Sequence, residues 1–128
     1  MLLVYKPIQM TNKMLKFVDI GQQNPPKRDK SQRKEDFGEI YQEFIHDRAK
    51  EQSSRCSQCG VPFCQVHCPL SNNIPDWLKL TAEGRYEEAY HLSQSTNNMP
   101  EVCGRICPQD RLCAVSYTHL TLPTTKNV

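Results

Sequence analysis

Cysteines in two groups carry the chemistry that this sequence can support. The first group places four thiols between Cys56 and Cys68, and the second runs from Cys103 to Cys113. Bacterial ferredoxins bind iron–sulfur cubes through a Cys-x2-Cys-x2-Cys-x3-Cys-Pro run, whose fourth cysteine ligates the other cluster. The first group has this run with a longer middle spacer. The sequence therefore predicts iron–sulfur binding.

The spacing also indicates how the ligands divide between two clusters. Sulfide-bridged iron is soft and prefers thiolate, and three thiolates on one tight loop can hold three corners of a cube. We expect the first three cysteines to hold one 4Fe-4S cluster, and the fourth to reach toward a second cluster together with the last two. The six predicted ligands are Cys56, Cys59, Cys64, Cys68, Cys107 and Cys113.

Three other interpretations of the cysteines compete with this one. Zinc sites also use Cys-x2-Cys pairs, and His67 beside Cys68 would then be a ligand, which makes a zinc-stabilised interaction module the alternative. A disulfide framework is disfavoured because the cysteine count is seven and no secretory segment is present. A free cysteine can also be a small buried apolar residue, and this description fits Cys103 best.

The residues around the cysteines form a longer pattern. It consists of Arg55-Cys56-x2-Cys59-Gly60-x-Pro62-Phe63-Cys64-x3-Cys68-Pro69, then Asn72-x-Ile74-Pro75, then Asn98-x-Pro100-Glu101-x-Cys103-Gly104-Arg105-Ile106-Cys107-Pro108-x4-Cys113. This pattern closely resembles the N-terminal iron-sulfur domain of the glutamate synthase small (beta) subunit. It is also similar to the N-terminal domain of dihydropyrimidine dehydrogenase. The resemblance is specific because both cysteine groups and the polar residues between them agree together.

This resemblance implies a fold and a function. The fold would be mainly α, a small helical iron-sulfur domain of the alpha-helical ferredoxin-like kind, with an extended N-terminal strap and no substantial sheet. The parent enzyme would use NADPH and FAD to reduce two 4Fe-4S clusters, which pass electrons to a large (alpha) subunit that makes glutamate from glutamine and 2-oxoglutarate. Related flavoproteins such as dihydropyrimidine dehydrogenase remain the alternative. In the family, the position of Cys103 is not a cluster ligand.

The sequence departs from the family after Cys113. The family continues with another cysteine four residues on, where this chain has Tyr117, so each cluster would lack one ligand here. We therefore expect a C-terminally truncated chain that divides into an extension and linker (1–34), an incomplete helical iron-sulfur domain (35–113) and a tail foreign to the family (114–128). No Gly-x-Gly-x-x-Gly turn occurs, so the FAD and NADPH sites would lie beyond this chain.

The spacing of apolar residues and the positions of proline and glycine predict the helices. Apolar residues from Phe37 to Ala49 recur at helical spacing, which favours one helix of about 20 residues beginning near Glu35. Between the cysteine groups we expect two short helices, the first starting near Pro75 and ending at Gly84. Pro25-Pro26 predicts an extended strap over residues 21–34, without helix or sheet pairing.

Charge and hydropathy exclude several classes of partner. The chain has 16 Lys plus Arg against 14 Asp plus Glu, so a net charge of +2 predicts neither nucleic-acid nor membrane-surface binding. No apolar run approaches the roughly 20 residues of a membrane span. The first residues lack the apolar length and cleavage site of a signal peptide. Reduced thiols then suit a cytoplasmic protein.

Overall fold

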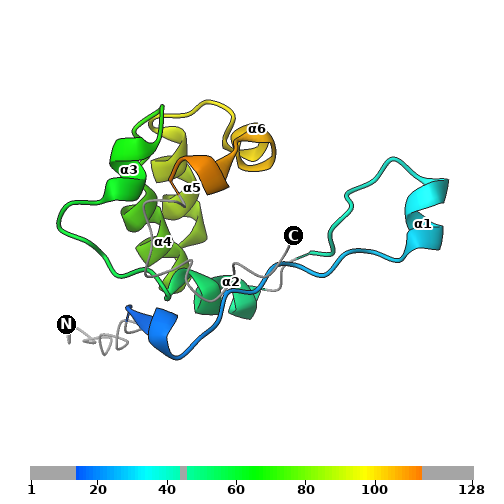
Figure 1. The fold of residues 1–128 in the computed structure, drawn as a ribbon, viewed down its shortest axis with the longest axis horizontal. Helices are drawn as coiled ribbons and strands as arrows, with labels where there is room; N and C mark the ends of the chain where they lie inside the picture. Colours follow the sequence, from blue (N-terminus) through cyan, green and yellow to red (C-terminus); the bar gives the residue numbers. More distant parts are fainter. Residues whose placement is uncertain (1–13, 44–45, 114–128) are drawn as a thin grey trace, which may run out of the picture.

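The computed structural model describes residues 14–43 and 46–113. Helices make up the framework of this part of the chain, and no β-strand forms within it. The mainly α fold without a substantial sheet is thus confirmed. Figure 1 shows α2 to α6 gathered in one body and α1 well away from it. The elements are η1 (Lys16–Val18), α1 (Lys30–Glu35), α2 (His46–Ser53), α3 (Phe63–His67), α4 (Ile74–Ala82), α5 (Tyr86–Gln94), α6 (Pro100–Ile106) and η2 (Gln109–Arg111).

The core of the helical body lies where α4 packs against α5 and α2. Ala82 on α4 is 0% exposed and Ala89 on α5 is 6% exposed. Such small side chains let two helices approach closely, and the body therefore closes without large buried aromatics. The two helices predicted between the cysteine groups are confirmed. Tyr90 on α5 is 52% exposed and does not belong to this core.

Local signals at both ends explain α4. Pro75 lies in the first turn, where its missing N–H costs no helical hydrogen bond. After the last turn Gly84 adopts a φ of 80°, a conformation that glycine reaches without a Cβ penalty. The N–H of Arg85 then bonds to the carbonyl of Leu80 at 2.9 Å, as expected for a helix that ends in a left-handed residue.

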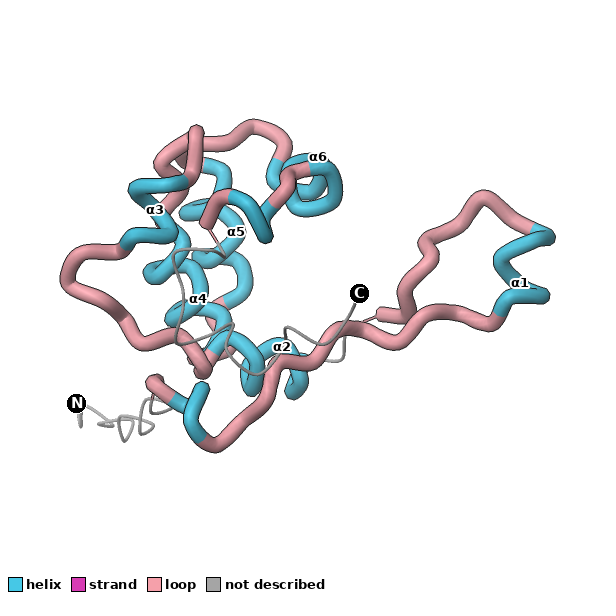
Figure 2. The backbone as a smooth tube through the Cα atoms, viewed as in Figure 1, coloured by secondary structure: helices cyan, strands magenta, loops and turns pink. Residues whose placement is uncertain are grey.

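Residues 21–43 form an arm that projects from the helical body (Figures 1 and 2). Its two limbs run antiparallel, with an isolated bridge between Lys27 and Tyr41. The N–H of Arg28 bonds to the carbonyl of Ile40 at 2.8 Å, and the N–H of Gln42 bonds to the carbonyl of Pro26 at the same distance. α1 lies at the end of the arm.

The expectation of an extended strap without helix or pairing holds only in part. Pro26 lacks an N–H, but its carbonyl still accepts a hydrogen bond from the other limb. Asp29 begins α1 because its carboxylate accepts the N–H of Ser31 at 3.1 Å. A hydrogen bond from the hydroxyl of Ser31, followed in effect by this backbone bond, holds the pKa of the Asp29 carboxyl below its usual range.

The prediction of one long helix from Glu35 was wrong. Residues 36–43 are not helical, and α2 begins at His46. Asp36 accepts the N–H of Gly38 at 2.9 Å, and Glu39 accepts the N–H of Tyr41 at 3.2 Å. These short-range bonds satisfy the backbone outside a helix. Phe37, the first of the apolar residues at helical spacing, is fully exposed, so its side chain has no surface to pack against.

Candidate iron-sulfur centre

The chain reaches its first cysteine through a buried segment. Ser54 is 1% exposed, Arg55 is 8% exposed and Cys56 is 2% exposed. The segment just before η1 covers them, because the N–H of Leu15 bonds to the carbonyl of Cys56 at 2.9 Å and the N–H of Lys16 bonds to that of Ser54 at 3.0 Å. The N-terminal residues therefore fix the start of the cysteine loop.

Arg55 places a cation directly before the first predicted ligand. Its Nε donates to the carbonyl of Ile20 at 2.9 Å. Burial lowers the pKa of the Arg55 guanidinium, but arginine remains protonated at neutral pH. The hydrogen bond to Ile20 ties the residue before Cys56 to the segment that follows η1.

Two side chains contact the sulfurs of the first loop. Gln58 donates to the Sγ of Cys56 from its backbone N–H at 3.5 Å and from its side-chain Nε2 at 3.4 Å. The Oγ of Ser57 lies 3.0 Å from the Sγ of Cys59. Donors to sulfur are among the levers by which a protein tunes an iron–sulfur cluster. Neither residue was singled out from the sequence, because glutamine and serine in a loop carry no distinctive pattern.

Helix α3 carries the second half of the first group. Cys64 is 2% exposed within it. Cys68 ends the helix with extended backbone, and its N–H bonds to the carbonyl of Cys64 at 3.1 Å. Pro69 follows and disfavours helical backbone at Cys68. The Cys-x3-Cys-Pro spacing thus becomes a helix whose final cysteine leaves the helical path.

Helix α6 repeats this arrangement in the second group. Cys107 ends it with extended backbone, its N–H bonds to the carbonyl of Cys103 at 3.0 Å, and Pro108 follows. The thiol of Cys103 donates to Oδ1 of Asn97 at 3.6 Å. Cys103 thus has a hydrogen-bond partner close to it in the chain, and it stays outside the predicted ligand set. Cys113 follows η2 and is half-buried.

Arg105 lies in α6 between Cys103 and Cys107, and it forms an ion pair with the arm. Its guanidinium pairs with Glu39 of the arm at 2.8 Å and lies 5.9 Å from the ring centre of Tyr41. The N–H of Tyr41, followed in effect by the charge of Arg105, holds the pKa of the Glu39 carboxyl below its usual range.

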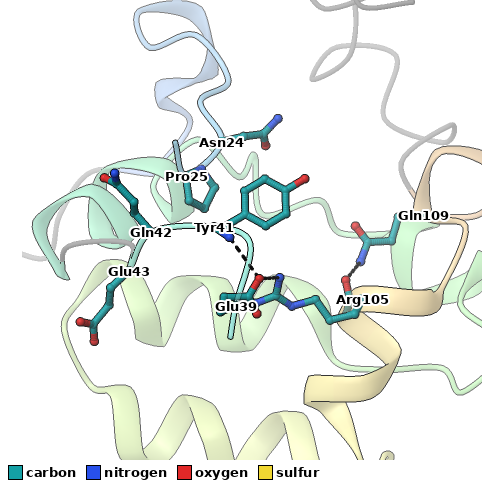
Figure 3. Close-up of a pocket in the computed structure, with 9 residues that line it drawn as sticks. Asn24, Pro25, Glu39, Tyr41, Gln42, Glu43, Arg105 and Gln109 are labelled. Atoms are coloured by element: carbon teal, nitrogen blue, oxygen red, sulfur yellow. Dashed lines mark hydrogen bonds and ion pairs between the residues drawn. The ribbon is translucent and has the colours of Figure 1, made fainter. Parts of the chain in front are cut away.

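This contact borders an open pocket of about 770 Å³ between the arm and α6, shown in Figure 3. Most of the residues that line it are polar and none is a cysteine, so the pocket is separate from the predicted ligands. The lining residues are Asn24, Pro25, Glu39, Tyr41, Gln42, Glu43, Gly104, Arg105 and Gln109.

The donor set fits an iron–sulfur cluster. None of the seven cysteines, all of which lie in the described residues, forms a disulfide, so their sulfurs suit cluster ligation. His67, the extra donor of the zinc interpretation, is exposed on α3. Within residues 14–43 and 46–113, no three His, Cys, Asp or Glu side chains converge closely enough to hold a single metal ion. The ligand assignment itself stays a prediction. The tail over residues 114–128 and Tyr117 lie outside the described residues.

The helices of the described residues include none that is both long enough and apolar enough to cross a membrane.

A helical body that carries cysteines in short helices, at their ends and in the adjoining loops is the architecture expected of a small iron–sulfur domain. Residues 33–121 match the family described as dihydropyrimidine dehydrogenase domain II, 4Fe-4S cluster. This match covers more than half of the chain, and the chain therefore belongs to that family.

Curated relatives place the chain more narrowly. It is 69% identical over 101 residues to the glutamate synthase [NADPH] small chain of Azospirillum brasilense, a match that covers 79% of this chain and 21% of the relative. It is 50% identical over 109 residues to the protein of the same name from Escherichia coli strain K12, covering 85% and 23%. For Bacillus subtilis strain 168 the identity is 39% over 101 residues, covering 72% and 20%. The chain thus spans about a fifth of the length of these relatives.

Proposed function

We propose that this chain is the iron–sulfur part of an NADPH-dependent glutamate synthase small subunit. Residues 35–113 form the electron-transfer domain, with residues 1–34 as its extension and residues 114–128 outside it. One 4Fe-4S cluster takes the first three cysteines and a second takes the remaining three, each with its fourth ligand from elsewhere. The proposed ligands are Cys56, Cys59 and Cys64, then Cys68, Cys107 and Cys113.

The observation that carries this proposal is the repeated end of α3 and α6. In both helices a cysteine leaves the helical path just before a proline, and none of the described cysteines forms a disulfide. The loop from Cys56 to Cys59 adds hydrogen-bond donors aimed at sulfur. When bound, such clusters supply one-electron transfer. The residues of this chain would hold them and supply N–H donors to the sulfurs.

The names of the relatives, small chains of an NADPH-dependent glutamate synthase, support a parent enzyme of that kind. In the reaction that we propose for this parent, NADPH reduces FAD, and the electrons reach a large (alpha) subunit that forms glutamate from glutamine and 2-oxoglutarate. Because the sequence contains no Gly-x-Gly-x-x-Gly turn, we assign the FAD and NADPH sites to parts of the enzyme outside this chain. The chain then has no complete active site of its own. A cytoplasmic location suits both the thiols and this chemistry.

Anaerobic reconstitution tests the proposal. The 128-residue chain is supplied with ferrous iron, sulfide and a small thiol that can act as the fourth ligand. We expect a brown protein that contains iron and sulfide in matched amounts. Cys59→Ser should lose roughly half of both, because it removes a ligand from one of two clusters. Cys103→Ser is the matched control and should keep them.

Each contrary outcome has a distinct meaning. A colourless protein with stoichiometric zinc would favour an interaction module without a redox role. Equal iron loss in Cys59→Ser and Cys103→Ser would contradict the ligand set. The family description names dihydropyrimidine dehydrogenase, so a related flavoprotein is the second candidate parent. Genomic sequence that follows the Cys113 codon in frame would distinguish the two parents.

A further inference from the structure

Gln58 has contacts that no predicted role accounts for. It lies between Cys56 and Cys59 with a φ of 52°, in the left-handed region that residues other than glycine seldom adopt. This conformation directs its backbone N–H toward the Sγ of Cys56 at 3.5 Å, while its side-chain Nε2 lies 3.4 Å from the same sulfur. Two donors from one residue therefore contact one thiol.

The side chain of Gln58 also joins the cysteine loop to the core. Its Nε2 donates to the carbonyl of Pro75 at 2.7 Å. Pro75 is buried in the first turn of α4, the helix that packs against α5 and α2. The two hydrogens of the amide group serve the sulfur and the carbonyl respectively. Because α4 anchors the amide, the fold itself sets the distance between this donor and Cys56.

Hydrogen-bond donors near the Sγ of Cys56 affect how easily a bound cluster accepts negative charge. Reduction of a thiolate-bound cluster adds negative charge, part of which resides on the sulfurs. A hydrogen-bond donor stabilises the more negative state more strongly than the less negative one. A donor held near the Sγ of Cys56 therefore raises the reduction potential, and its removal lowers it.

We propose that Gln58 is a positioning residue that raises the reduction potential of the 4Fe-4S cluster held by Cys56, Cys59 and Cys64. The inference rests on the proposed function, because it requires that cluster. The side-chain amide acts through the sulfur of Cys56, and its bond to Pro75 keeps it there.

The test is an anaerobic potentiometric titration of the reconstituted 128-residue chain. Gln58→Met keeps the side-chain length and the backbone strain but removes the donor. We expect the equilibrium constant for reduction of one cluster to fall roughly tenfold, a shift of about 59 mV for a one-electron couple. Gln58→Gly keeps the backbone donor, tolerates the left-handed φ and should shift the potential in the same direction.

Gln65→Met is the matched control. Gln65 is the residue after Cys64, and its Nε2 donates to Oδ1 of Asn73 at 2.9 Å rather than to sulfur. Its loss should leave both potentials unchanged.

The possible failures can be told apart. A wild-type chain that takes up no iron overturns the proposed function and this inference with it. Variants of Gln58 that load iron with wild-type potentials overturn the role of Gln58 alone. Loss of iron from both Gln58 variants, with Gln65→Met still loaded, would overturn tuning in favour of a purely structural role.

Discussion

Cys64 and Cys103 occupy the same place in two short helices, each four residues before a cysteine that ends the helix. Cys64 is 2% exposed, whereas Cys103 is half-buried. The helix of Cys64, α3, contacts α4 of the core. The helix of Cys103, α6, meets the arm through the ion pair between Arg105 and Glu39, whose side chains are 57% and 52% exposed.

This difference shows that one local arrangement can be held in two ways. Around the first cysteine group, amide hydrogen bonds and burial tie the loop to α4. Around the second group, an exposed ion pair makes the connection, and such pairs contribute little because water and salt screen them. We therefore infer that the first group is positioned by the core, whereas α6 can adjust its position at small cost.

The largest expected effect comes from Asn72, which lies just after the first cysteine group. Its Oδ1 accepts the indole N–H of Trp77 at 2.8 Å, and its Nδ2 donates to the carbonyl of Ser93 at 2.9 Å and the hydroxyl of Thr96 at 3.0 Å. Asn72→Ala leaves these groups unpaired and should lower the free energy of unfolding by about 1–3 kcal/mol. Urea denaturation of the metal-free chain, followed by Trp77 fluorescence, measures this loss.

Asn97 is the counterpart near the second group. Its Oδ1 accepts the N–H of Met99 at 3.0 Å and the thiol of Cys103. Asn97→Ala should lower the free energy of unfolding by only about 0.5–1 kcal/mol, because Met99 is exposed and its N–H can bond to water. Equal losses in the two variants would contradict the distinction between the groups.

Two glycines should respond with opposite signs. Gly84 has a φ of 80°, and a Cβ there would lie 2.9 Å from Cε of Lys50. Gly84→Ala should therefore destabilise the chain by about 1–2 kcal/mol. Gly104 lies inside α6 with nothing within 4 Å of an added Cβ. Gly104→Ala should stabilise α6 by about 0.5–1 kcal/mol, because alanine favours a helix more than glycine does.

Urea denaturation measures the Gly84 effect, and amide hydrogen exchange within α6 measures that of Gly104. Slower exchange in α6 after Gly104→Ala is the expected result. Faster exchange would show that the added Cβ destabilises α6, which would contradict the open space around Gly104.

The smallest effect is a pH dependence confined to the second group. The lowered pKa of Glu39 means that the folded carboxyl binds a proton less readily than the unfolded one. Its contribution is thus present above the unfolded pKa and is lost as the pH falls through the folded pKa, below about pH 4. NMR titration should show the amides of Tyr41 and Arg105 shifting in this range, while the side-chain amide of Gln58 stays unchanged. Glu39→Gln should abolish these NMR shifts. An equal shift of the Gln58 amide would contradict the inference that the two cysteine groups are held independently.

Sequence patterns predicted the parts of the fold that local rules govern. Pro75 and Gly84 mark the ends of α4, and each acts through its own backbone. The same patterns failed over residues 36–43, where the periodicity favoured a helix. There the side chains of Asp36 and Glu39 bond to nearby N–H groups, and no apolar surface covers Phe37. A periodic stripe predicts a helix only where the fold supplies something for it to pack on.

The candidate site divides in the same way. The cysteines were found from spacing because iron–sulfur ligation demands particular residues at particular intervals. Gln58 was missed because its role depends on a left-handed turn and on the carbonyl of Pro75, which lies 17 residues away along the chain. No local pattern records such a contact.

The sequence by itself determined that Cys68 and Cys107 end their helices, since each precedes a proline whose ring disfavours helical backbone in the residue before it. It also determined the two groups of thiols and the family to which they point. Only the tertiary structure decided that Cys64 is buried against the core while Cys103 is half-buried, and that Arg105 pairs with the arm. Burial and pairing depend on which segments fold against one another, and that information is spread over the whole chain.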